Sequence, residues 1–330
     1  METKEALYYE KLSGGDVRCV LCPNHCHIGE GRQGRCGLRD NEGGVLIARS
    51  YGNTVTLAID PVEKKPLYHF LPGTEILSIG PNGCTLTCDH CQNWSISQVR
   101  APVRYIPPGE LPRLARENGC ASIAFTYTEP LLWYEYLIDA LPLLRKTGVR
   151  SVLVTNGYLD EEPARRIIPL VDAFNVDLKG FTEEFYRDVC GGSLEPVKRF
   201  IEIAAGRAHV EVTTLVIPGL NDSAGEIERL AQWLAGVSRE IPFHLSRFHP
   251  GHRMMDRDRT SERTMLESYE IARRFLDYVY LGNIFIEGTS GTVCPGCGQT
   301  VIKRIGYSVG LPEIPGRCGG CGRDIKGVWE

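Results

Sequence analysis

The sequence predicts an α/β protein built around a partial (β/α)6-type barrel. Strand-like and helix-like patterns alternate between residues 76 and 284, and repeated βα units require a parallel sheet covered by helices. Eleven of the thirteen cysteines fall into three clusters, one inside this region and one on either side of it. We therefore expect three parts: a cysteine-rich N-terminal metal-binding segment (1–48), the barrel (49–288) and a C-terminal zinc ribbon (289–330).

Composition places the chain among globular proteins. Of its 330 residues, 42% are hydrophobic and 24% charged, and a net charge of −4 provides no basic field, so nucleic acid is not an expected partner. The first residues have no apolar signal core and no run reaches membrane-span length, so we expect a cytoplasmic protein. In a reducing compartment, clustered cysteines indicate metal ligands, whereas the isolated Cys120 and Cys190 are expected to be buried packing residues.

The N-terminal cluster has the spacing C-x2-C-x3-C-x9-C and comprises Cys19, Cys22, Cys26 and Cys36. Its glycine-rich, polar surroundings offer little apolar material for a core, so four thiolates around a metal are expected to order the segment. Two occupants suit such a site: a single zinc ion, or an auxiliary [4Fe-4S] cluster that relays electrons. His25 and His27 are spare ligand candidates, although a solvent-facing position is expected for each.

The barrel elements follow from the pattern of apolar residues. Residues 45–60 alternate between apolar and polar and predict one or two strands, followed by an extended, proline-punctuated segment over 61–70. Beyond it we expect strands at 76–80, 122–128, 151–156, 173–179, 209–217, 241–248 and 278–284, and helices at 131–147, 160–170, 182–206, 223–237 and 261–275. An open doubly wound sheet is the alternative, but no Gly-x-Gly-x-x-Gly follows the first strand, which argues against a dinucleotide site.

The second cysteine cluster, Cys84, Cys88 and Cys91, follows the strand predicted at 76–80 and has the spacing C-x3-C-x2-C. Four cysteines ordinarily ligate a [4Fe-4S] cluster. Three would hold three of its irons and leave the fourth open to another ligand. A zinc knuckle with a remote fourth ligand is the alternative. Because the loop leaves the carboxyl end of a strand, it lies where parallel α/β barrels collect their chemistry.

Polar side chains also gather at the ends of the later strands. They are Thr126, Thr128, Glu129, Thr155, Asn156, Asp177, Lys179, Asn221, Asp222, His244, Ser246, Arg247 and His249. Individually, each could be ordinary loop polarity or a helix cap, as Asp222 or Ser223 could be for the helix that follows. Together, they supply donors and acceptors suited to a zwitterion, a ribose and an adenine.

Arg247 and His249 lie at the end of the sixth predicted strand. An arginine packed under helices would cost several kcal/mol unless it were paired, so we expect Arg247 to reach the mouth of the barrel. There, its planar guanidinium would suit a carboxylate or phosphate of the substrate or cofactor, with His249 or His69 as hydrogen-bond partner. A salt bridge from Arg247 to a neighbouring loop is the alternative.

The C-terminal cluster consists of two C-x2-C pairs separated by twenty residues: Cys294, Cys297, Cys318 and Cys321. This spacing is typical of a structural zinc ribbon. A ribbon can bind nucleic acid or protein, but a role in stability is the preferred interpretation, since zinc can order a small unit that lacks its own core. Residues 288–291 are the expected linker.

In these motifs and their order, the chain resembles the radical S-adenosylmethionine (AdoMet) superfamily. Within it, the chain is similar to the pyruvate formate-lyase activating enzymes and, more narrowly, to the radical AdoMet member of the AmmeMemoRadiSam system. The motifs are the C-x3-C-x2-C triad followed by Gln92-Asn93, Cys19-Val-Leu-Cys-Pro, Lys65-Pro-Leu-Tyr-His-Phe, Tyr127-Thr-Glu-Pro, Val154-Thr-Asn-Gly, Asn175-Val-Asp-Leu-Lys, Ile217-Pro-Gly-Leu-Asn-Asp, Ser246-Arg-Phe-His-Pro and the terminal ribbon.

The resemblance implies that AdoMet chelates the open iron of the cluster held by the triad and is cleaved reductively to a 5′-deoxyadenosyl radical. The radical would abstract hydrogen from a substrate that the motifs do not identify. Such chemistry belongs to the cofactor, and the protein supplies binding and orientation. The resemblance also implies an external electron donor of the flavodoxin or ferredoxin type, and Memo-like and AMMECR-type partner proteins.

The resemblance assigns further roles by position. Thr128–Glu129 stands where relatives meet the AdoMet amino group, and Thr155–Asn156 matches a turn near the methionine part and the ribose. Asp177 and Lys179 match a motif whose lysine approaches the AdoMet carboxylate, a charge-assisted contact. His90 occupies the position whose backbone meets adenine.

Three positions depart from the family pattern. Tyr127–Thr128 replaces a Gly-Gly pair, so the backbone approach to AdoMet could differ. His90 replaces the usual aromatic residue before the third cysteine. Val154 replaces an acidic residue that activating enzymes place before Thr-Asn-Gly, which puts a cation site beside AdoMet in doubt.

Three functions fit this sequence. The first is a radical AdoMet enzyme acting on a small molecule or a peptidyl residue. The second is an activase that generates a glycyl radical in a protein backbone, which requires an open groove, whereas an enzyme for a small molecule should close over its site. The third is an iron–sulfur sensor or binding module without catalysis, which the intact triad argues against.

Overall fold

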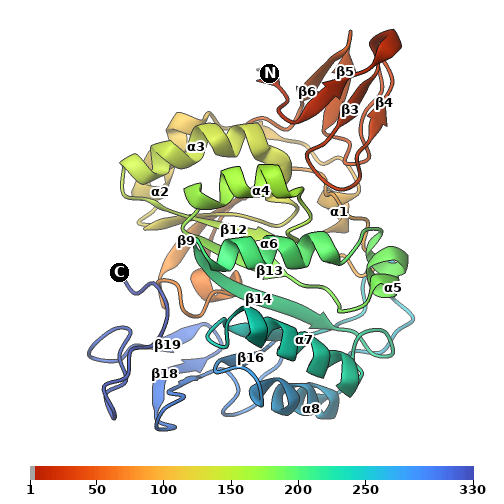
Figure 1. The fold of residues 1–330 in the computed structure, drawn as a ribbon. Coiled ribbons are helices and arrows are strands. Elements are labelled where there is room, and N and C mark those ends of the chain that lie inside the picture. The colour runs from red at the N-terminus through yellow and green to blue at the C-terminus, as the bar shows by residue number, and fades with distance from the viewer. Residues whose placement is uncertain (1–3) are drawn as a thin grey trace.

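Seven parallel strands form the centre of the structure, a computed structural model that describes residues 4–330 (Figure 1). They lie side by side in chain order, and an eighth strand pairs antiparallel with the first of them. In order across the sheet, the strands are β8 (Thr56–Pro61), β9 (Glu75–Gly80), β11 (Ser122–Phe125), β12 (Arg150–Thr155), β13 (Ala173–Asp177), β14 (His209–Val216), β15 (Phe243–Arg247) and β16 (Val279–Gly282).

The strand order decides between the two architectures that the sequence left open. A doubly wound sheet reverses direction at a switch point, whereas here every parallel strand follows the previous one on the same side. The edge strands β8 and β16 are not paired with each other in the described part of the chain, so the sheet is open. Lys64, beyond β8, and Asn283, beyond β16, nevertheless line one cavity, which requires the sheet to curve.

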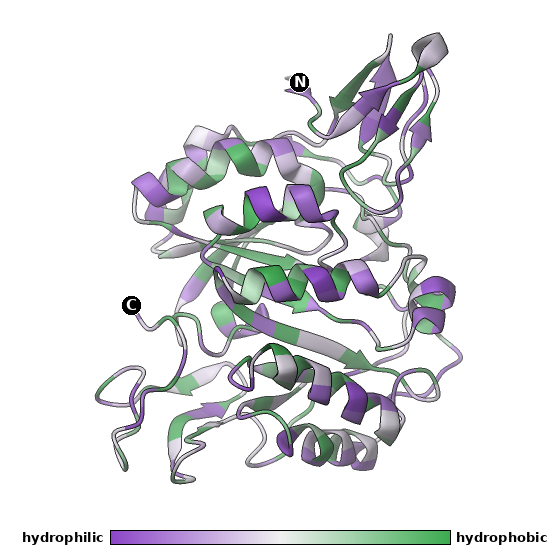
Figure 2. Ribbon diagram, in the orientation of Figure 1, coloured by the Kyte–Doolittle hydropathy of each residue, from purple (hydrophilic) through white to green (hydrophobic). Residues whose placement is uncertain are grey.

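Helices cover the outer face of the sheet (Figure 1). They are α2 (Leu111–Glu117), α3 (Tyr134–Lys146), α4 (Glu161–Ile167), α6 (Glu195–Ala205), α7 (Ala224–Val237) and α8 (Glu262–Arg273), with the short α1 (Trp94–Ser97) and α5 (Glu183–Phe185) near the carboxyl ends of the strands. Figure 2 shows apolar and polar residues side by side along these helices. In α7, the buried apolar residues recur at helical spacing, as expected for a helix with one face on a core.

The local signals explain where these elements begin. The Ser223 hydroxyl oxygen accepts a hydrogen bond from the Glu226 amide at 3.3 Å and starts α7, and Ser261 accepts from the Thr264 amide at 3.0 Å and starts α8. The predicted strands from 76 to 284 and helices from 131 to 275 are confirmed, with ends that differ by a few residues. α2 was not predicted. Within residues 4–330, no helix is both long and apolar enough to cross a bilayer.

The N-terminal part contributes buried apolar residues to the hydrophobic core that it shares with the sheet and its helices, so the expectation that it has little apolar material is wrong. Two three-stranded sheets form from β1 (Lys4–Glu5), β2 (Tyr9–Lys11), β3 (Val17–Cys19), β4 (His27–Ile28), β5 (Arg39–Glu42) and β6 (Val45–Ala48). Val17, Leu21, Ile28 and Leu46 are almost completely buried, in one cluster with Leu77 and Ile79 of β9. The strands are so short that their alternation is hard to recognise in the sequence.

A buried ion pair joins the N-terminal part to the sheet-covering helices. Arg39 donates from Nη2 to Glu135 Oε1 of α3 at 2.6 Å, and both side chains are 2% exposed. The Leu7 amide also donates to Glu135 Oε1, at 2.7 Å. The N-terminal strands are therefore fixed to the outside of the sheet at α3.

The segment that follows β8 crosses the inner face of the sheet. The amides of Tyr68 and His69 both donate to the Glu211 carboxylate of β14, and the shortest of these bonds is 2.7 Å. Glu211 is fully buried and also lies 3.0 Å from His209 Nε2 and 2.6 Å from His244 Nε2. Burial opposes ionisation of Glu211, but the two histidines outweigh it and hold the pKa of this carboxyl well below its usual range.

The C-terminal unit docks on the same segment. It contains β17 (Thr292–Val293), β18 (Thr300–Ile305) and β19 (Ser308–Gly310). Arg304 donates to the Tyr68 carbonyl at 2.6 Å, the Val328 amide donates to the His69 carbonyl at 2.7 Å, and the His69 ring lies 2.7 Å from the Lys326 carbonyl. His69 is fully buried by these contacts. The suggestion that His69 binds substrate at the mouth is therefore wrong.

We expect Glu211→Gln to lower the free energy of unfolding by about 3–5 kcal/mol, because it removes one partner from a buried, hydrogen-bonded charge network. Denaturant titration at pH 7 measures this loss. Because the folded pKa lies below the ordinary value, the contribution of Glu211 is present above that value and is lost as the pH falls. The difference between wild type and variant should therefore shrink on acidification. Glu267→Gln, at an exposed ion pair on α8, is the control and should change nothing measurable.

Candidate active site

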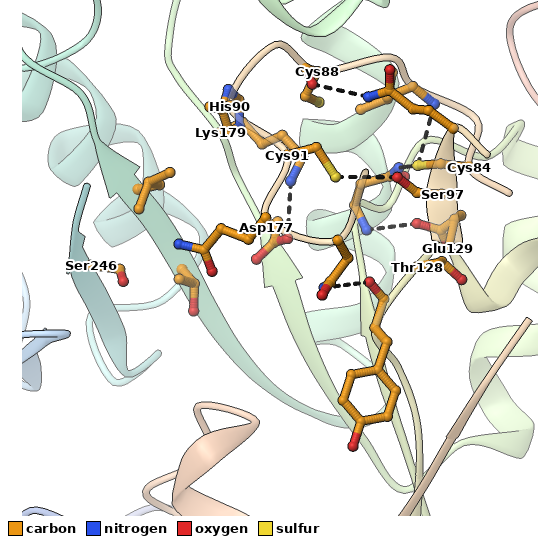
Figure 3. Close-up of a pocket in the computed structure, with 18 of the residues that line it drawn as sticks. Cys84, Cys88, His90, Cys91, Ser97, Thr128, Glu129, Asp177, Lys179 and Ser246 are labelled. Carbon is orange, nitrogen blue, oxygen red and sulfur yellow. Dashed lines mark hydrogen bonds and ion pairs between the residues drawn. The ribbon is translucent and has the colours of Figure 1, made fainter. Parts of the chain in front are cut away.

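A cavity of about 300 Å³ opens at the carboxyl ends of the parallel strands. Its lining comes from the loop after β9, the ends of β11 to β13, residues of β14 and β15, and the segments beyond β8 and β16 (Figure 3). It holds the triad Cys84, Cys88 and Cys91 together with Thr128, Glu129, Asn156, Asp177, Lys179 and His90, as the sequence analysis expected. Residues far apart in the chain meet here because parallel strands all end at the same edge.

The triad loop is held by backbone bonds to a segment that follows α5. The Thr87 amide donates to the Cys190 carbonyl at 2.9 Å and the Asp89 amide to the Val189 carbonyl at 3.0 Å. Cys91 Sγ lies 3.2 Å from Ser97 Oγ, and the Asn156 amide group donates to Cys84 Sγ at 3.5 Å. The loop conformation is thus fixed by the protein itself.

The three thiols suit an iron–sulfur cluster better than a single zinc ion. A structural zinc site takes four protein ligands, whereas this loop supplies three thiolates. Three thiolates would hold three irons of a [4Fe-4S] cluster and leave the fourth iron open to another ligand. Burial raises the pKa of Cys84 and Cys91, so a bound metal must favour the thiolate form.

Glu129 ties the ends of β11 and β12 together beneath the triad. Its carboxylate accepts hydrogen bonds from Thr155 Oγ1 at 2.6 Å, the Asn156 amide at 2.9 Å and the Leu131 amide at 2.9 Å. Burial raises the pKa of Glu129 to about 7, although these donors act in the opposite direction. Glu129 can therefore carry a negative charge near neutral pH and still exchange a proton.

The opposite charge in this part of the cavity belongs to Lys179. Its ammonium group lies 3.0 Å from Asp177 Oδ2, and both side chains line the cavity (Figure 3). Together with Glu129, the Lys179–Asp177 pair gives the cavity one ammonium group and two carboxylate groups. Such an arrangement can bind the amino and carboxylate groups of a zwitterion.

Tyr127 has a backbone conformation that is rare for a bulky residue. Its φ is +72°, in the left-handed region that glycine adopts without cost. The phenol donates to Asp60 Oδ2 at 2.7 Å, and Lys65 Nζ lies 4.8 Å from the ring centroid. These contacts hold the strained residue in place, and its carbonyl accepts a hydrogen bond from Asn93 at 2.7 Å.

Lys64 brings a positive charge to the wall of the cavity opposite the triad, as one member of a group with Asp60 and Lys65. Lys64 Nζ and Lys65 Nζ lie 2.7 and 2.5 Å from the two oxygens of Asp60, so two ammonium groups share one carboxylate. Burial opposes ionisation of Asp60, but hydrogen bonds from the lysines and Tyr127 hold its pKa well below its usual range. The Lys64 side chain is 50% exposed and lines the cavity, whereas Lys65 is buried.

Arg247 and His249 do not lie where the sequence predicted. Arg247 is buried away from the cavity and donates from Nε to the Thr260 carbonyl at 2.6 Å, so its placement over the mouth is wrong. Ser246, one residue earlier, lines the cavity, because neighbouring strand residues point to opposite faces. His249 is exposed outside the cavity, with Nε2 3.5 Å from the Asn283 carbonyl.

Two residues at the site were not foreseen. Cys190, expected to serve only packing, is fully buried, and its Sγ lies within 4.8 Å of both Cys88 Sγ and a His90 ring nitrogen. Asn283 donates to Ser246 Oγ at 2.9 Å and adopts a positive φ of 57° at the cavity rim. No local pattern marks either residue. Their positions near the cavity follow only from the tertiary structure.

His90 lines the cavity beside the triad. Burial lowers the pKa of His90 to about 3, so its imidazole is neutral at pH 7. Its Nδ1 is buried and has no hydrogen-bond partner among the described residues. The ring centroid lies 6.1 Å from that of Phe185. A neutral ring with an unused nitrogen suits contact with a polar heterocycle.

Comparison with known proteins agrees with this geometry. A family model described as the Radical SAM superfamily matches residues 78–234. An uncharacterized protein of Methanocaldococcus jannaschii is 40% identical, over 98% of both chains. The benzylsuccinate synthase activating enzyme of Thauera aromatica is 27% identical over 72% of each protein, and the pyruvate formate-lyase-activating enzyme of Clostridium pasteurianum is 23% identical over 51% of this chain and 72% of that enzyme.

A solved structure shares the fold. SuiB of Streptococcus suis, bound to S-adenosylmethionine, superposes with a TM-score of 0.50 over 67% of this chain and 53% of that protein, at 13% identity. At this identity, the likeness extends to the arrangement of strands and helices alone.

We expect Thr155→Val to destabilise the metal-free protein by about 1–3 kcal/mol, because Glu129 would lose its shortest hydrogen bond in a buried site. The lost bond favours the ionised form, so the variant should raise the pKa of Glu129 above about 7. The difference in unfolding free energy between wild type and variant should therefore grow as the pH rises past 7. Urea titrations at pH 6 and pH 8 measure it, with Thr147→Val on the exposed end of α3 as control. An equal loss at both pH values would contradict the proposed charge.

Proposed function

Because the chain belongs to the radical SAM superfamily, we propose that the cavity at the strand ends is its active site, in which Cys84, Cys88 and Cys91 hold a [4Fe-4S] cluster. The protein is a radical SAM enzyme. With the cluster and AdoMet bound and one electron supplied by an external donor, the site would provide reductive cleavage of AdoMet and abstraction of a hydrogen atom from a substrate. The observation that carries the assignment is the meeting of three cysteine thiols with the Glu129 network and Lys179 in one cavity.

The residues around the triad supply the binding groups that AdoMet needs. Glu129 is positioned by Thr155 and Asn156 to accept the amino group, and Lys179 to bind the carboxylate. His90, neutral and with an unused ring nitrogen, lies where a purine can stack or accept a hydrogen bond. The family pattern supports these roles, which remain proposals for this chain.

The substrate is proposed to occupy the far wall, between Lys64 and Ser246. The excess positive charge of the Lys64–Asp60–Lys65 group favours an anionic substrate, and Thr213, Ser246 and Asn283 add hydroxyl and amide groups on the same cavity. Lys64 thereby takes the role that the sequence analysis gave to Arg247. Its half-exposed ammonium can approach a carboxylate or phosphate while Asp60 holds it at the rim.

We further propose that the enzyme is the radical AdoMet member of the AmmeMemoRadiSam system, acting with Memo-like and AMMECR-type proteins. The motif order along nearly the whole chain supports this subfamily. A second candidate function, activation of a glycyl-radical enzyme, is supported by the two activating enzymes among the relatives. A glycyl radical on a partner protein, detected by electron paramagnetic resonance after incubation with AdoMet and reductant, would establish the second function instead.

The C-terminal cysteines are proposed to hold structural zinc, as a ribbon. Cys294 Sγ lies 3.6 Å from Cys321 Sγ, and Cys297 Sγ 3.5 Å from Cys318 Sγ, and all four lie within 4.8 Å of one another. These separations agree with about 3.8 Å for four thiolates on one tetrahedral zinc. The ribbon (289–330) and the N-terminal segment (1–48) would then be separate units around the radical SAM core (49–288).

We expect Cys84→Ala, Cys88→Ala and Cys91→Ala each to abolish AdoMet cleavage, because three ligands leave no substitute thiolate. Formation of 5′-deoxyadenosine under anaerobic reduction measures this. Cys120→Ala, a buried cysteine far from any cluster in sequence, is the matched control and should remain active. If all three triad variants still cleave AdoMet, the proposed function is wrong.

We expect Lys64→Met to raise the KM of an anionic substrate about tenfold or more, since a hydrogen bond to a charged group contributes about 1.5–3 kcal/mol. Candidate carboxylates, phosphates and their neutral analogues are first screened for deuterium transfer into 5′-deoxyadenosine. Lys146→Met, exposed on α3, is the control. An effective substrate that is neutral, or an anionic one whose KM the Lys64 variant leaves unchanged, would exclude Lys64 as the binding group.

A further inference from the structure

A hollow of about 380 Å³ adjoins the triad loop on the surface of the protein. Its lining comes from the N-terminal loop at 33–38, the triad loop at 82–87 and residues 97–100 at the end of α1. The N-terminal loop is fixed there because Arg35 donates to Thr87 Oγ1 at 3.1 Å. We propose that this hollow is the docking site of an acidic electron-donor protein, whose carboxylates bind Arg35 and Arg100.

The hollow carries positive charge without a counter-ion. Arg35 and Arg100 both line it and are exposed, and its lining contains no aspartate, glutamate or lysine among the described residues. The acceptors that the two guanidinium groups contact are all neutral: Asn24 Oδ1, Thr87 Oγ1, Gln33 Oε1 and the Gly37 carbonyl. Two positive charges are therefore available to carboxylates of a partner, and complementary charge speeds the encounter of two proteins.

The hollow and the active-site cavity share a wall. The residues that line both are Cys84, Leu86, Ser97 and Gln98. Cys84 is one of the three thiols proposed to hold the cluster, so a donor seated in the hollow would lie beside a cluster ligand. Electron transfer slows steeply with distance, and this position keeps the path short. Lys179 and Lys64 line the cavity but not the hollow, so a docked donor leaves the proposed AdoMet and substrate groups free.

Apolar surface beside the arginines suits a protein better than a small anion. Val99 lines the hollow and is 52% exposed, and the buried Leu38 and Leu86 add further apolar lining. Protein interfaces combine apolar contacts with a polar rim and are enriched in arginine, whereas a small anion gains nothing from an exposed valine. Electron-transfer complexes bury little surface, so a small hollow and its rim are sufficient for such a partner.

The docked complex would transfer one electron. The donor is oxidised by one electron, the cluster bound at the triad is reduced by one, and no bond forms or breaks in this step. The transfer rests on the proposed function, since it requires a cluster at the triad. The binding of an acidic protein at Arg35 and Arg100 does not, and can be measured separately.

Binding is tested by isothermal titration calorimetry of the full-length protein with purified flavodoxin and with a [2Fe-2S] ferredoxin, at low ionic strength. Wild type should bind at least one of them. Arg35→Gln/Arg100→Gln should weaken that binding about fivefold, the effect of two exposed charge pairs, and should make the Kd less dependent on salt. Arg35→Lys/Arg100→Lys keeps both charges and should restore most of the affinity.

The matched control is Arg116→Gln/Arg207→Gln. It also removes two exposed arginines, neither of which lines the hollow or pairs with a carboxylate among residues 4–330. Its affinity for the donor should equal that of wild type. An equal loss of affinity in this control would show that only the overall charge matters, and would overturn the docking site.

Cleavage of AdoMet then separates docking from chemistry. With the donor that binds, Arg35→Gln/Arg100→Gln should need about fivefold more reduced protein for half-maximal formation of 5′-deoxyadenosine. With dithionite, a small reductant that needs no docking site, the variant and wild type should react at the same rate. An equal loss with both reductants would mean that the arginines support the active site itself, and would overturn the docking proposal.

The docking proposal and the proposed function fail in different ways. If wild type binds neither donor, or the glutamine double variant binds as tightly as wild type, the docking site is wrong, while cleavage driven by dithionite still supports the radical site. If the donor binds through the two arginines but dithionite yields no 5′-deoxyadenosine, the proposed function is wrong and the docking site stands.

Discussion

The buried carboxylate of Glu211 is the interaction on which the arrangement of this molecule depends. A charge with no exposure is tolerable only when its hydrogen-bonding capacity is met, and here two backbone amides and two histidines meet it. Because the amides belong to the segment at 68–69, the same contact fixes the chain that crosses the inner face of the sheet. That chain sets the cavity wall at Lys64 and the docking site of the C-terminal unit. One carboxylate thereby links the sheet, the cavity and the tail.

The cysteine sets differ in how the fold holds their loops. In the C-terminal unit, two pairs of Sγ atoms lie 3.5 and 3.6 Å apart, and all four lie within 4.8 Å of one another. The triad loop is fixed by backbone hydrogen bonds to Val189 and Cys190, and the N-terminal set packs against the hydrophobic core that it shares with the sheet. Apolar packing therefore helps to order the N-terminal part, which its polar, glycine-rich sequence did not indicate.

The positive charge at the cavity wall opposite the triad belongs to Lys64, whereas the strand pattern indicated Arg247. Arg247 lies on the face of β15 opposite to Ser246 and turns its guanidinium to a backbone carbonyl. Lys64 instead reaches the cavity because Asp60, at the end of β8, holds both neighbouring lysines and leaves a surplus of positive charge. The strained Tyr127 completes this group from the neighbouring side. Because Lys64 and Lys65 share Asp60 as a counter-ion, the group retains one positive charge that can favour an anionic ligand.

The sequence by itself determined the order of strands and helices, the triad after β9, and the polar strand ends at Glu129, Asn156, Asp177 and Lys179, because periodicity and spacing are local properties. The tertiary structure alone decided which face Arg247 takes, that Cys190 and Asn283 join the site, and that the two histidines serve Glu211. It also decided that the four C-terminal thiols lie within 4.8 Å of one another. These features depend on contacts between residues distant in the chain, and local pattern carries no information about the separation in space of such residues.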